Sequence, residues 1–457
     1  MFLHSELTPH TSASNIERVS ENTETGQAIN LDPWFGHYAD RASGLSASEV
    51  RALFAVASRP EVVSLAGGMP FVRALPEDLV NGALARVMKE QGPTALQYGS
   101  GQGVPALREQ ILDIMALEGI SASVDDIVVT TGSQQALDLV TKLFINPGDV
   151  VLAEAPSYVG AIGVFRSYQA HIEHVAMDND GLIPDALRNA ITRMRAEGRT
   201  IKFLYTIPNF HNPAGVTLSA ERRPEILRIC QDAGILVLED NPYGLLSFDE
   251  DVPPAIRSLD HDGVIYLGSF SKTLAPGFRV GWALAPHAIR EKLVLAAESA
   301  ILCPSSFSQL VISEYLASSD WMGQIVSFRD VYRERRDTML TSLAEHLPEL
   351  SWTVPNGGFY VWVTLPDALD SKAMLPRAVT ELVAYTPGTA FYADGGGRQN
   401  LRLSFCYPTP ENIRIGIRRL ATVINGELDL LSTFAGTGSL TAAAGEDNVI
   451  SPPPDMS

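Results

Sequence analysis

SFSKTLAPGFRVGW, residues Ser269–Trp282, lies between two short apolar runs of this 457-residue chain. The runs Val264–Leu267 and Val280–Ala285 have the length and composition of buried strands, and Gly and Pro punctuate the segment between them. Lys272 therefore stands at the mouth of a buried strand. Because lysine is almost never fully buried without a partner, this position favours a chemical role for Lys272 over core packing.

Lys272 is flanked by groups that bind anions: Ser269 and Ser271 come just before it, and Arg279 follows it. An ordinary lysine has a pKa of about 10.4, so imine formation at neutral pH requires burial or a neighbouring cation. We interpret Lys272 as the residue that forms an imine with an aldehyde cofactor. The two serines and the arginine would then bind the phosphate of that cofactor. The alternative is a solvated lysine in a loop, because short motifs also match by chance.

Composition restricts the class of protein. Hydrophobic residues make up 46% of the chain and charged residues 19%, as in ordinary globular proteins, and the length suits two or more domains. The net charge of −19 argues against nucleic acid or a membrane surface as a partner. We find no apolar run long enough for a membrane span and no signal-peptide pattern. Cys230, Cys303 and Cys406 have no metal-binding spacing, which favours a cytoplasmic protein.

Between its ends the chain alternates strand-like and helical patterns, which predicts βαβ units, that is, an α/β fold with a mostly parallel sheet between two helical layers. The predicted strands are Ile127–Thr131, Val150–Ala153, Ile172–Ala176, Phe203–Thr206, Ile235–Leu238, Val264–Leu267 and Gly281–Leu284. The predicted helices between them are Gln134–Phe144, Tyr158–Tyr168, Pro184–Glu197, Ala220–Ala233 and Ala288–Ala300.

The segments outside this sheet predict a smaller α+β domain built from both chain ends. Helices are expected at Leu45–Ala57, Glu77–Glu90, Phe307–Ala317, Trp321–His346 and Pro410–Ile424, and strands at Gly358–Thr364 and Leu401–Phe405. We divide the chain into a disordered arm (1–30), the first part of the small domain (31–75), the large domain (76–305), the rest of the small domain (306–432) and a disordered tail (433–457).

The segment Thr130–Leu139, TTGSQQALDL, predicts a strand, a tight turn at Gly132 and a helix start. The free backbone amides of Ser133 and Gln134 would point outward with the helix dipole behind them, which is a ready site for a phosphate. The alternative is ordinary capping of the helix by Ser133.

Two further segments follow the ends of predicted strands. In Tyr205–Gly215, YTIPNFHNPAG, Asn212 precedes a proline, and its amide could donate to a phenolate or a carboxylate. In Gly234–Leu246, GILVLEDNPYGLL, Asp240 could hold a protonated pyridine nitrogen, and Tyr243 could reach the phenolic oxygen of the same ring. An Asn-Pro turn and a helix-capping aspartate are the alternatives.

Arg402 lies in the alternating strand pattern Asn400–Phe405, NLRLSF. An arginine between apolar residues can form two parallel hydrogen bonds with a carboxylate. The alternative is a surface arginine on an edge strand.

Taken in order, the phosphate turn, Asn-Pro, Asp-x-x-Tyr, Ser-x-x-Lys with a following Arg, and the late Arg resemble the fold-type-I pyridoxal-phosphate aminotransferases of class I/II. The resemblance covers about residues 45–425. Within that family the chain is most similar to the 2-aminoadipate, kynurenine and aromatic amino acid aminotransferases. The segments that carry this similarity are Ser64–Pro70 (SLAGGMP), Leu96–Gly103 (LQYGSGQG), TTGSQQALDL and SFSKTLAPGFRVGW.

The resemblance implies a role for each matched residue. Lys272 would hold pyridoxal 5′-phosphate and move a proton between the substrate Cα and the cofactor. The other implied cofactor contacts are Asp240 at the ring nitrogen, Asn212 and Tyr243 at the ring oxygen, Tyr158 on the ring face, and Ser133, Gln134, Ser269, Ser271 and Arg279 at the phosphate. Arg402 would bind the substrate α-carboxylate with Asn212 and the backbone of Gly68. Tyr98 would reach the phosphate of a neighbouring subunit, which implies a homodimer with shared sites.

The resemblance leaves two alternatives open. Lyases and synthases of the same fold use the same cofactor, and some bacterial regulators fuse this segment to a winged-helix DNA-binding domain. The segment before Leu45 is short and polar, without a basic helix–turn–helix pattern, which argues against the regulator. No second arginine announces a dicarboxylic substrate, so we expect an aromatic, 2-aminoadipate-like or large aliphatic L-amino acid, with 2-oxoglutarate as the acceptor.

Overall fold

The computed structural model describes residues 32, 34–45, 59–249 and 251–435. The predicted arm 1–30, the predicted helix Leu45–Ala57 beyond its first residue, and the predicted tail beyond Ala435 lie outside these residues. Near the N-terminus, two 3-10 helices are formed, η1 (Phe35–His37) and η2 (Asp40–Gly44). The ring of Trp34 contacts His37 edge-on, with ring centroids 5.8 Å apart.

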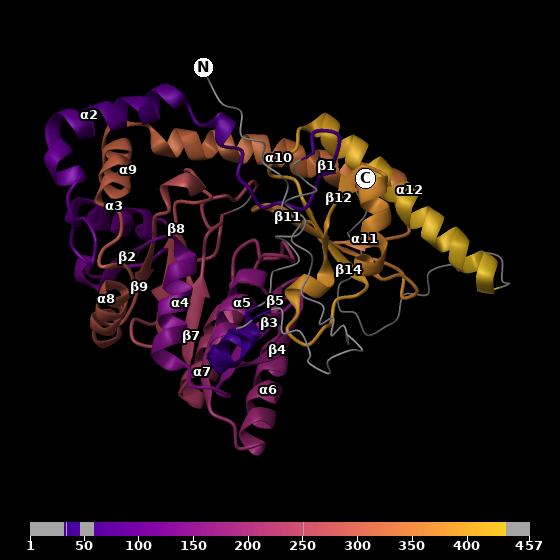
Figure 1. Ribbon diagram of the computed structural model, residues 1–457, viewed down its shortest axis with the longest axis horizontal. Coiled ribbons are helices and arrows are strands. Elements are labelled where there is room, and N and C mark those ends of the chain that lie inside the picture. The colour runs from indigo at the N-terminus through magenta and orange to yellow at the C-terminus, as the bar shows by residue number, and fades with distance from the viewer. Residues whose placement is uncertain (1–31, 33, 46–58, 250, 436–457) are drawn as a thin grey trace, which may run out of the picture. The chain divides into compact units, whose positions relative to one another are not determined.

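The remainder of the chain is built on an eight-stranded sheet with the order β2-β9-β8-β7-β6-β3-β4-β5 (Figure 1). Its strands are β2 (Ile127–Thr130), β3 (Val150–Ala155), β4 (His171–Asp178), β5 (Gly181–Leu182), β6 (Ile201–Thr206), β7 (Leu236–Asp240), β8 (Val264–Ser269) and β9 (Gly281–Leu284). Strands β4, β3, β6, β7 and β8 are parallel neighbours, whereas β9 and β5 pair in the antiparallel direction. The mostly parallel sheet is confirmed.

Helices cover both faces of this sheet because the strands are apolar on both sides. Successive strand residues point to opposite faces, so Val151 and Ala153 pack in one core cluster, whereas Val150 and Leu152 pack in another. The first face carries α4 (Ser133–Phe144), α5 (Val159–Ser167) and α8 (His287–Ile301). The other face carries α6 (Pro184–Ala196), α7 (Arg222–Ala233), α2 (Glu77–Ala95), α3 (Pro105–Ala116) and α9 (Ser306–Ser318). The three-layer αβα arrangement is confirmed.

A four-stranded antiparallel sheet lies beside the large one, with the order β10 (Ser351–Trp352), β11 (Tyr360–Thr364), β14 (Asn400–Ser404) and β13 (Thr386–Pro387) (Figure 1). The helices α10 (Trp321–His346), α11 (Ser371–Thr380) and α12 (Pro410–Ala435) pack with it in one hydrophobic core. Strand β1 (Val63–Ser64) pairs in parallel with β12 (Val383–Ala384), which joins the two ends of the chain in this smaller α+β unit.

The remaining 3-10 turns are η3 (Val72–Ala74), η4 (Val124–Asp126), η5 (Ile256–Ser258), η6 (Pro276–Phe278) and η7 (Gly388–Phe391). The helix predicted at Pro410–Ile424 continues to Ala435, and α3 was not predicted. The domain boundaries remain a prediction. The helices expected at Glu77–Glu90 and Phe307–Ala317, which the sequence placed with the smaller domain, are α2 and α9, and both share a core cluster with strands of the large sheet, so we propose that the second boundary follows α9. None of the described helices is long and apolar enough to cross a membrane.

Candidate active site

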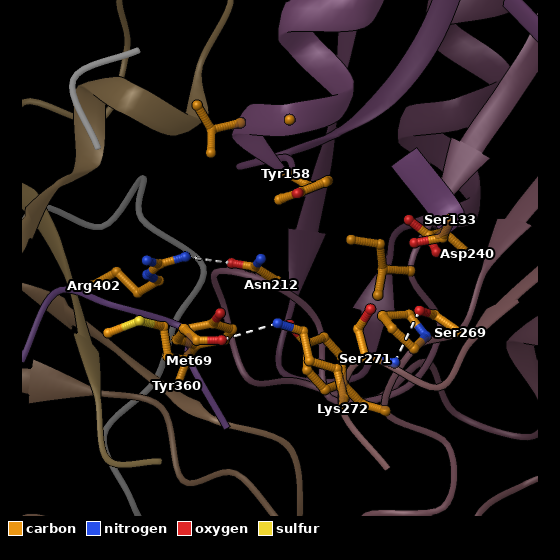
Figure 2. Close-up of a pocket in the computed structure, with 16 residues that line it drawn as sticks. Met69, Ser133, Tyr158, Asn212, Asp240, Ser269, Ser271, Lys272, Tyr360 and Arg402 are labelled. Atoms are coloured by element: carbon orange, nitrogen blue, oxygen red, sulfur yellow. Dashed lines mark hydrogen bonds between the residues drawn. The ribbon is translucent and has the colours of Figure 1, made fainter. Parts of the chain in front are cut away.

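A cavity of about 350 Å³ opens at the edge of the large sheet where its parallel strands end. This is the edge at which open α/β sheets bind ligands. Lys272 lies in the middle of the view in Figure 2, with Arg402 on one side and Ser133, Ser269, Ser271 and Asp240 on the other. The residues that line the cavity are Gly68, Met69, Ser133, Tyr158, Val159, Gly160, Ile207, Asn212, Asp240, Pro242, Tyr243, Ser269, Ser271, Lys272, Tyr360 and Arg402.

The amine of Lys272 is directed into this cavity. Its Nζ donates a 2.9 Å hydrogen bond to the carbonyl oxygen of Gly68 and lies 5.7 Å from the centre of the Phe359 ring. Burial lowers the pKa of Lys272 to about 8, and the positive charges of Arg402 and Arg279 act in the same direction. About a tenth of the amine is therefore unprotonated at pH 7, far more than for an ordinary lysine, and the unprotonated amine is the nucleophilic form.

Asp240, the last residue of β7, presents a half-satisfied carboxylate. Its Oδ2 accepts a 2.8 Å hydrogen bond from the hydroxyl of Tyr205, whereas its buried Oδ1 has no hydrogen-bond partner among the described residues. Burial raises the pKa of Asp240 to about 6, and the Tyr205 hydrogen bond opposes this rise. A buried acceptor without a partner is costly, so this geometry favours a ligand with an N–H or cationic group beside Oδ1.

Arg402 is 3% exposed, and among the described residues it forms no ion pair with a carboxylate. Its Nη1 donates to Asn212 Oδ1 (2.8 Å) and its Nη2 donates to the carbonyl oxygen of Ala66 (2.7 Å). The guanidinium carbon lies 4.2 Å from the centre of the Tyr360 ring and 4.8 Å from that of Phe391. A buried cation needs a counter-charge, so this part of the cavity favours an anionic group of the ligand.

The bond to Arg402 also fixes the orientation of the side chain of Asn212, a residue that is joined to Pro213 by a cis peptide bond. Because Oδ1 accepts from Arg402, the amide nitrogen of Asn212 is the end that remains as a donor on the lining of the cavity. The predicted role of Asn212 as a donor therefore agrees with this orientation.

The N-terminus of α4 and the β8–β9 connection meet at the other side of the cavity. No side chain caps α4 at Gly132, so its first amides remain as donors. Ser271 N donates to Ser269 Oγ (3.1 Å), and Arg279 Nη1 donates to Ser271 Oγ (3.4 Å). Gly132 has φ +78°, and a Cβ there would lie 2.5 Å from Arg279 Nη2. Hydroxyls, a guanidinium and a helix N-terminus together form an anion site.

Two of the predicted cofactor contacts, Gln134 and Arg279, are not among the residues that line the cavity, but each is bonded to one that is. Gln134 accepts a 3.2 Å hydrogen bond from the Tyr158 hydroxyl, and Arg279 reaches the site through Ser271. Burial raises the pKa of Tyr158 to about 12, so this hydroxyl remains a donor. Tyr98 is 77% exposed and lines a separate surface cavity with Leu96 and Phe307, not the cavity that contains Lys272.

Two tyrosines of the site were not predicted from the sequence. Tyr205 holds Asp240, and Tyr360 packs under Arg402 with its hydroxyl against Gly68. Burial raises the pKa of Tyr243, and the neighbouring hydroxyl of Tyr360 acts in the same direction. A tyrosine in a buried strand needs a partner for its hydroxyl, and this is the signal that could have identified both residues.

The comparisons with known proteins agree with this site. The family model "Aminotransferase class I and II" matches residues 71–420. The chain belongs to this family of aminotransferases. It is 41% identical to aromatic-amino-acid aminotransferase 1 of Thermococcus litoralis over 416 residues, which cover 90% of this chain and 99% of the relative. It is 38% identical to the 2-aminoadipate transaminase of Thermus thermophilus over 403 residues, which cover 87% and 99% of the two chains.

Solved structures place the aminotransferase in the same branch. The kynurenine aminotransferase of Pyrococcus horikoshii, solved in complex with pyridoxamine phosphate, superposes with a TM-score of 0.82 at 40% identity, and the match covers 86% of this chain and 97% of that one. The protein is therefore a pyridoxal-phosphate-dependent transaminase. Its cavity fits that cofactor, because Oδ1 of Asp240 has no donor among the described residues and no side chain caps the N-terminus of α4.

Proposed function

We propose that this aminotransferase moves the amino group of an L-amino acid with an aromatic, 2-aminoadipate-like or large aliphatic side chain to 2-oxoglutarate by a ping-pong mechanism. The observation that carries this proposal is the buried guanidinium of Arg402, which shares one cavity with the amine of Lys272. A guanidinium without a carboxylate partner suits the α-carboxylate that amino acids and 2-oxo acids share. Both substrates can therefore use one site in turn.

The rest of the cavity supports the aromatic and large aliphatic members of the proposed substrate class. Among the described lining residues, Lys272 and Arg402 are the basic ones, and both already have roles. The apolar and aromatic lining includes Met69, Ile207 and Tyr360. This lining favours large apolar side chains.

We assign the predicted roles as part of this proposal. Asp240 would hold the protonated ring nitrogen of pyridoxal phosphate, with Asn212 and Tyr243 at the ring oxygen and Tyr158 on the ring face. Ser133, Gln134, Ser269, Ser271 and Arg279 would bind the phosphate. The bound cofactor supplies an electron sink that acidifies the substrate Cα–H. The Nζ of Lys272, with its pKa lowered to about 8, can take up and release that proton near neutral pH.

We also propose a cytoplasmic homodimer in which Tyr98 of one subunit reaches the phosphate site of the other. The 77% exposure of Tyr98, and its place on a surface cavity with Leu96 and Phe307, support a partner on that face. The buried free thiols of Cys230 and Cys406 agree with a reducing compartment.

A half-reaction screen tests the proposed activity. Single amino acids are added to the yellow holoenzyme, the loss of its visible absorbance is followed, and the products are analysed. We expect aromatic, 2-aminoadipate-like or large aliphatic L-amino acids to bleach the absorbance and to give the matching 2-oxo acid, and 2-oxoglutarate to restore it. Release of ammonia and pyruvate would instead show a lyase, and would contradict the proposal.

A further inference from the structure

Two buried asparagines connect the loops that carry the cofactor contacts. Asn209 lies in the loop after β6, which also carries Asn212, and Asn241 directly follows Asp240 in the loop that carries Tyr243. The side-chain nitrogen of Asn209 donates a 3.1 Å hydrogen bond to Oδ1 of Asn241. Asn209 is 1% exposed and Asn241 is 4% exposed, so this bond is shielded from water.

Each end of this amide pair meets an ionisable side chain: Arg223 at one end and Glu118, whose pKa burial raises to about 7, at the other. Arg223 Nη2 donates to Oδ1 of Asn209 (2.6 Å), and the side-chain nitrogen of Asn241 donates to Oε2 of Glu118 (2.8 Å). The hydroxyl of Tyr266 donates to the same oxygen of Glu118 (2.5 Å). All donors therefore point the same way, from the guanidinium to the carboxylate, and such a chain strengthens each of its bonds in a buried setting.

None of these residues lines the cavity, so they can act on the cofactor only through their loops. Arg223 is also occupied elsewhere, because its other donors reach the carbonyl oxygens of Leu218, Pro253 and Pro254. It is therefore unavailable to a substrate. The chain of hydrogen bonds joins the loop after β6 to the loop after β7, at the sheet edge that carries Asn212, Asp240 and Tyr243.

We propose that Asn209 and Asn241, held between Arg223 and Glu118, are positioning residues that fix Asn212 relative to Asp240 and Tyr243. This inference rests on the proposed roles of those three residues. The cofactor ring is rigid, so Asn212 and Tyr243 can contact its oxygen while Asp240 contacts its nitrogen only if the two loops keep a fixed spacing. Breaking the asparagine pair would change that spacing. The orientation of Arg402, which we propose binds the substrate carboxylate, is then disturbed as well, because Arg402 is hydrogen-bonded to Asn212.

The substitution Asn241→Asp tests the proposal with almost no change of shape. It removes the amide donor and places a second carboxyl group against Glu118, so the two groups repel each other at a pH at which both are ionised. Donors aimed at the ring oxygen favour its ionised state, so their displacement moves the pH midpoint of the visible absorbance of the holoenzyme upward. We also expect the KM for the amino donor to rise about tenfold, the effect of one lost buried hydrogen bond.

A second substitution supplies a rescue. In the double variant Glu118→Gln/Asn241→Asp the amide and the carboxylate exchange places, so the introduced amide can donate to the introduced carboxylate and still accept from Tyr266. We expect this double variant to recover most of the wild-type midpoint and KM. Glu118→Gln alone retains an acceptor and should have a smaller effect than Asn241→Asp. The exposed Asn412→Asp adds the same charge elsewhere and should leave both values unchanged.

Two outcomes would overturn the proposal. One is an Asn241→Asp protein with lowered thermal stability but an unchanged midpoint and KM, which would show a merely structural role. The other is a double variant that is no better than the single one. If Asn241→Asp does not fold, Asn241→Ser removes the same bonds without adding charge. We expect it to show the same upward shift of the absorbance midpoint and the same rise in KM. The absorbance midpoint requires only the bound cofactor, so it tests the pair even if the amino donors that we propose do not react.

Discussion

The hydroxyl of Tyr205 donates a 2.8 Å hydrogen bond to Oδ2 of Asp240, while Oδ1 of the same carboxylate has no partner among the described residues. Burial raises the pKa of Asp240 to about 6, a value that already includes the opposing effect of this bond. Tyr205 therefore keeps Asp240 ionised near neutral pH, where the carboxylate can hold a protonated ring nitrogen.

Removing this hydroxyl should change the pH dependence of cofactor binding. In Tyr205→Phe the pKa of Asp240 rises further, by about one pH unit for one hydrogen bond to a charged group. Apoenzyme titrated with pyridoxal phosphate should then lose affinity at a higher pH than the wild type as the pH is lowered. Tyr385→Phe, which removes a buried hydroxyl bonded to Ser371, is the matched control. Equal pH profiles for Tyr205→Phe and the wild type would show that Tyr205 does not tune Asp240.

Arg402→Lys should weaken the binding of the amino donor far more than it lowers kcat. Lysine keeps the charge but loses the planar fork that now contacts Asn212 and Ala66. We expect KM for the amino donor to rise roughly 100-fold, with a smaller change in kcat. Arg398→Lys alters an exposed arginine paired with Asp370 and should leave KM unchanged. A loss confined to kcat would contradict the proposed role of Arg402 in binding the substrate carboxylate.

In the apoenzyme, the buried protonated amine of Lys272 should lower the free energy of unfolding. Its pKa is about 8 in the folded chain against an ordinary 10.5, and at about 1.36 kcal/mol per pKa unit this difference corresponds to ~3 kcal/mol. The pKa is lowered on folding, so the cost is fully present below about pH 8 and disappears as the pH rises through 10.5.

Lys272→Met apoenzyme should therefore melt at a higher temperature than wild-type apoenzyme at pH 7, and the gain should shrink at alkaline pH. The lost hydrogen bond to Gly68 offsets part of it. Thermal unfolding between neutral and alkaline pH measures the difference, with the exposed Lys292→Met as the control. A gain that did not change with pH would show that the charge of Lys272 is not its source.

The residues at strand ends were accessible from the sequence. Asp240 follows an apolar strand, Lys272 follows another, and Arg402 alternates with leucines, so local patterns report their positions. The partners that orient them are not local. Tyr205 meets Asp240 across neighbouring strands, and Asn212 meets Arg402 across 190 positions, so only the tertiary fold brings each pair together.

Local signals also misled at one helix end. Asn425–Gly426 is a typical stop signal, yet α12 continues to Ala435. Leu428 and Leu431 pack against the core of the smaller unit, and this burial outweighs the helix penalty of one glycine.

Shared active sites can be tested by mixing inactive subunits. If Tyr98 completes the site of its partner, co-expressed Lys272→Met and Tyr98→Ala chains form some dimers in which one site is fully wild type. Those preparations should show more activity than either variant alone. A mixture of Lys272→Met and Arg402→Ala should show no gain, because both residues line the cavity of one chain. If isolated dimers of one Lys272→Met and one Tyr98→Ala subunit are no more active than either variant alone, the proposed role of Tyr98 is excluded.

A histidine contact should make donor binding sensitive to acid. His174 on β4 accepts a 2.7 Å hydrogen bond at Nε2 from the backbone N–H of Ala393, and its Nδ1 lies 3.1 Å from the carbonyl oxygen of Glu154. These partners favour the neutral ring with its proton on Nδ1. Ala393 closely follows Phe391, whose ring packs on Arg402. Protonation of Nε2 would break the bond to Ala393 and loosen the wall of the proposed carboxylate site.

The direction of the pH effect follows from the pKa of His174. Burial lowers it, and the hydrogen bond to the Glu154 carbonyl and the carboxylates of Asp394 and Glu173 only partly oppose this. The contact is therefore intact above about pH 6.5, the ordinary histidine value, and is lost at lower pH as Nε2 is protonated. We expect KM for the amino donor to rise in acid for the wild type. In His174→Gln the side-chain oxygen can still accept from Ala393 and does not titrate, so its KM should remain flat, whereas the exposed His261→Gln should follow the wild type. Parallel profiles for the wild type and His174→Gln would show that this histidine does not control the site.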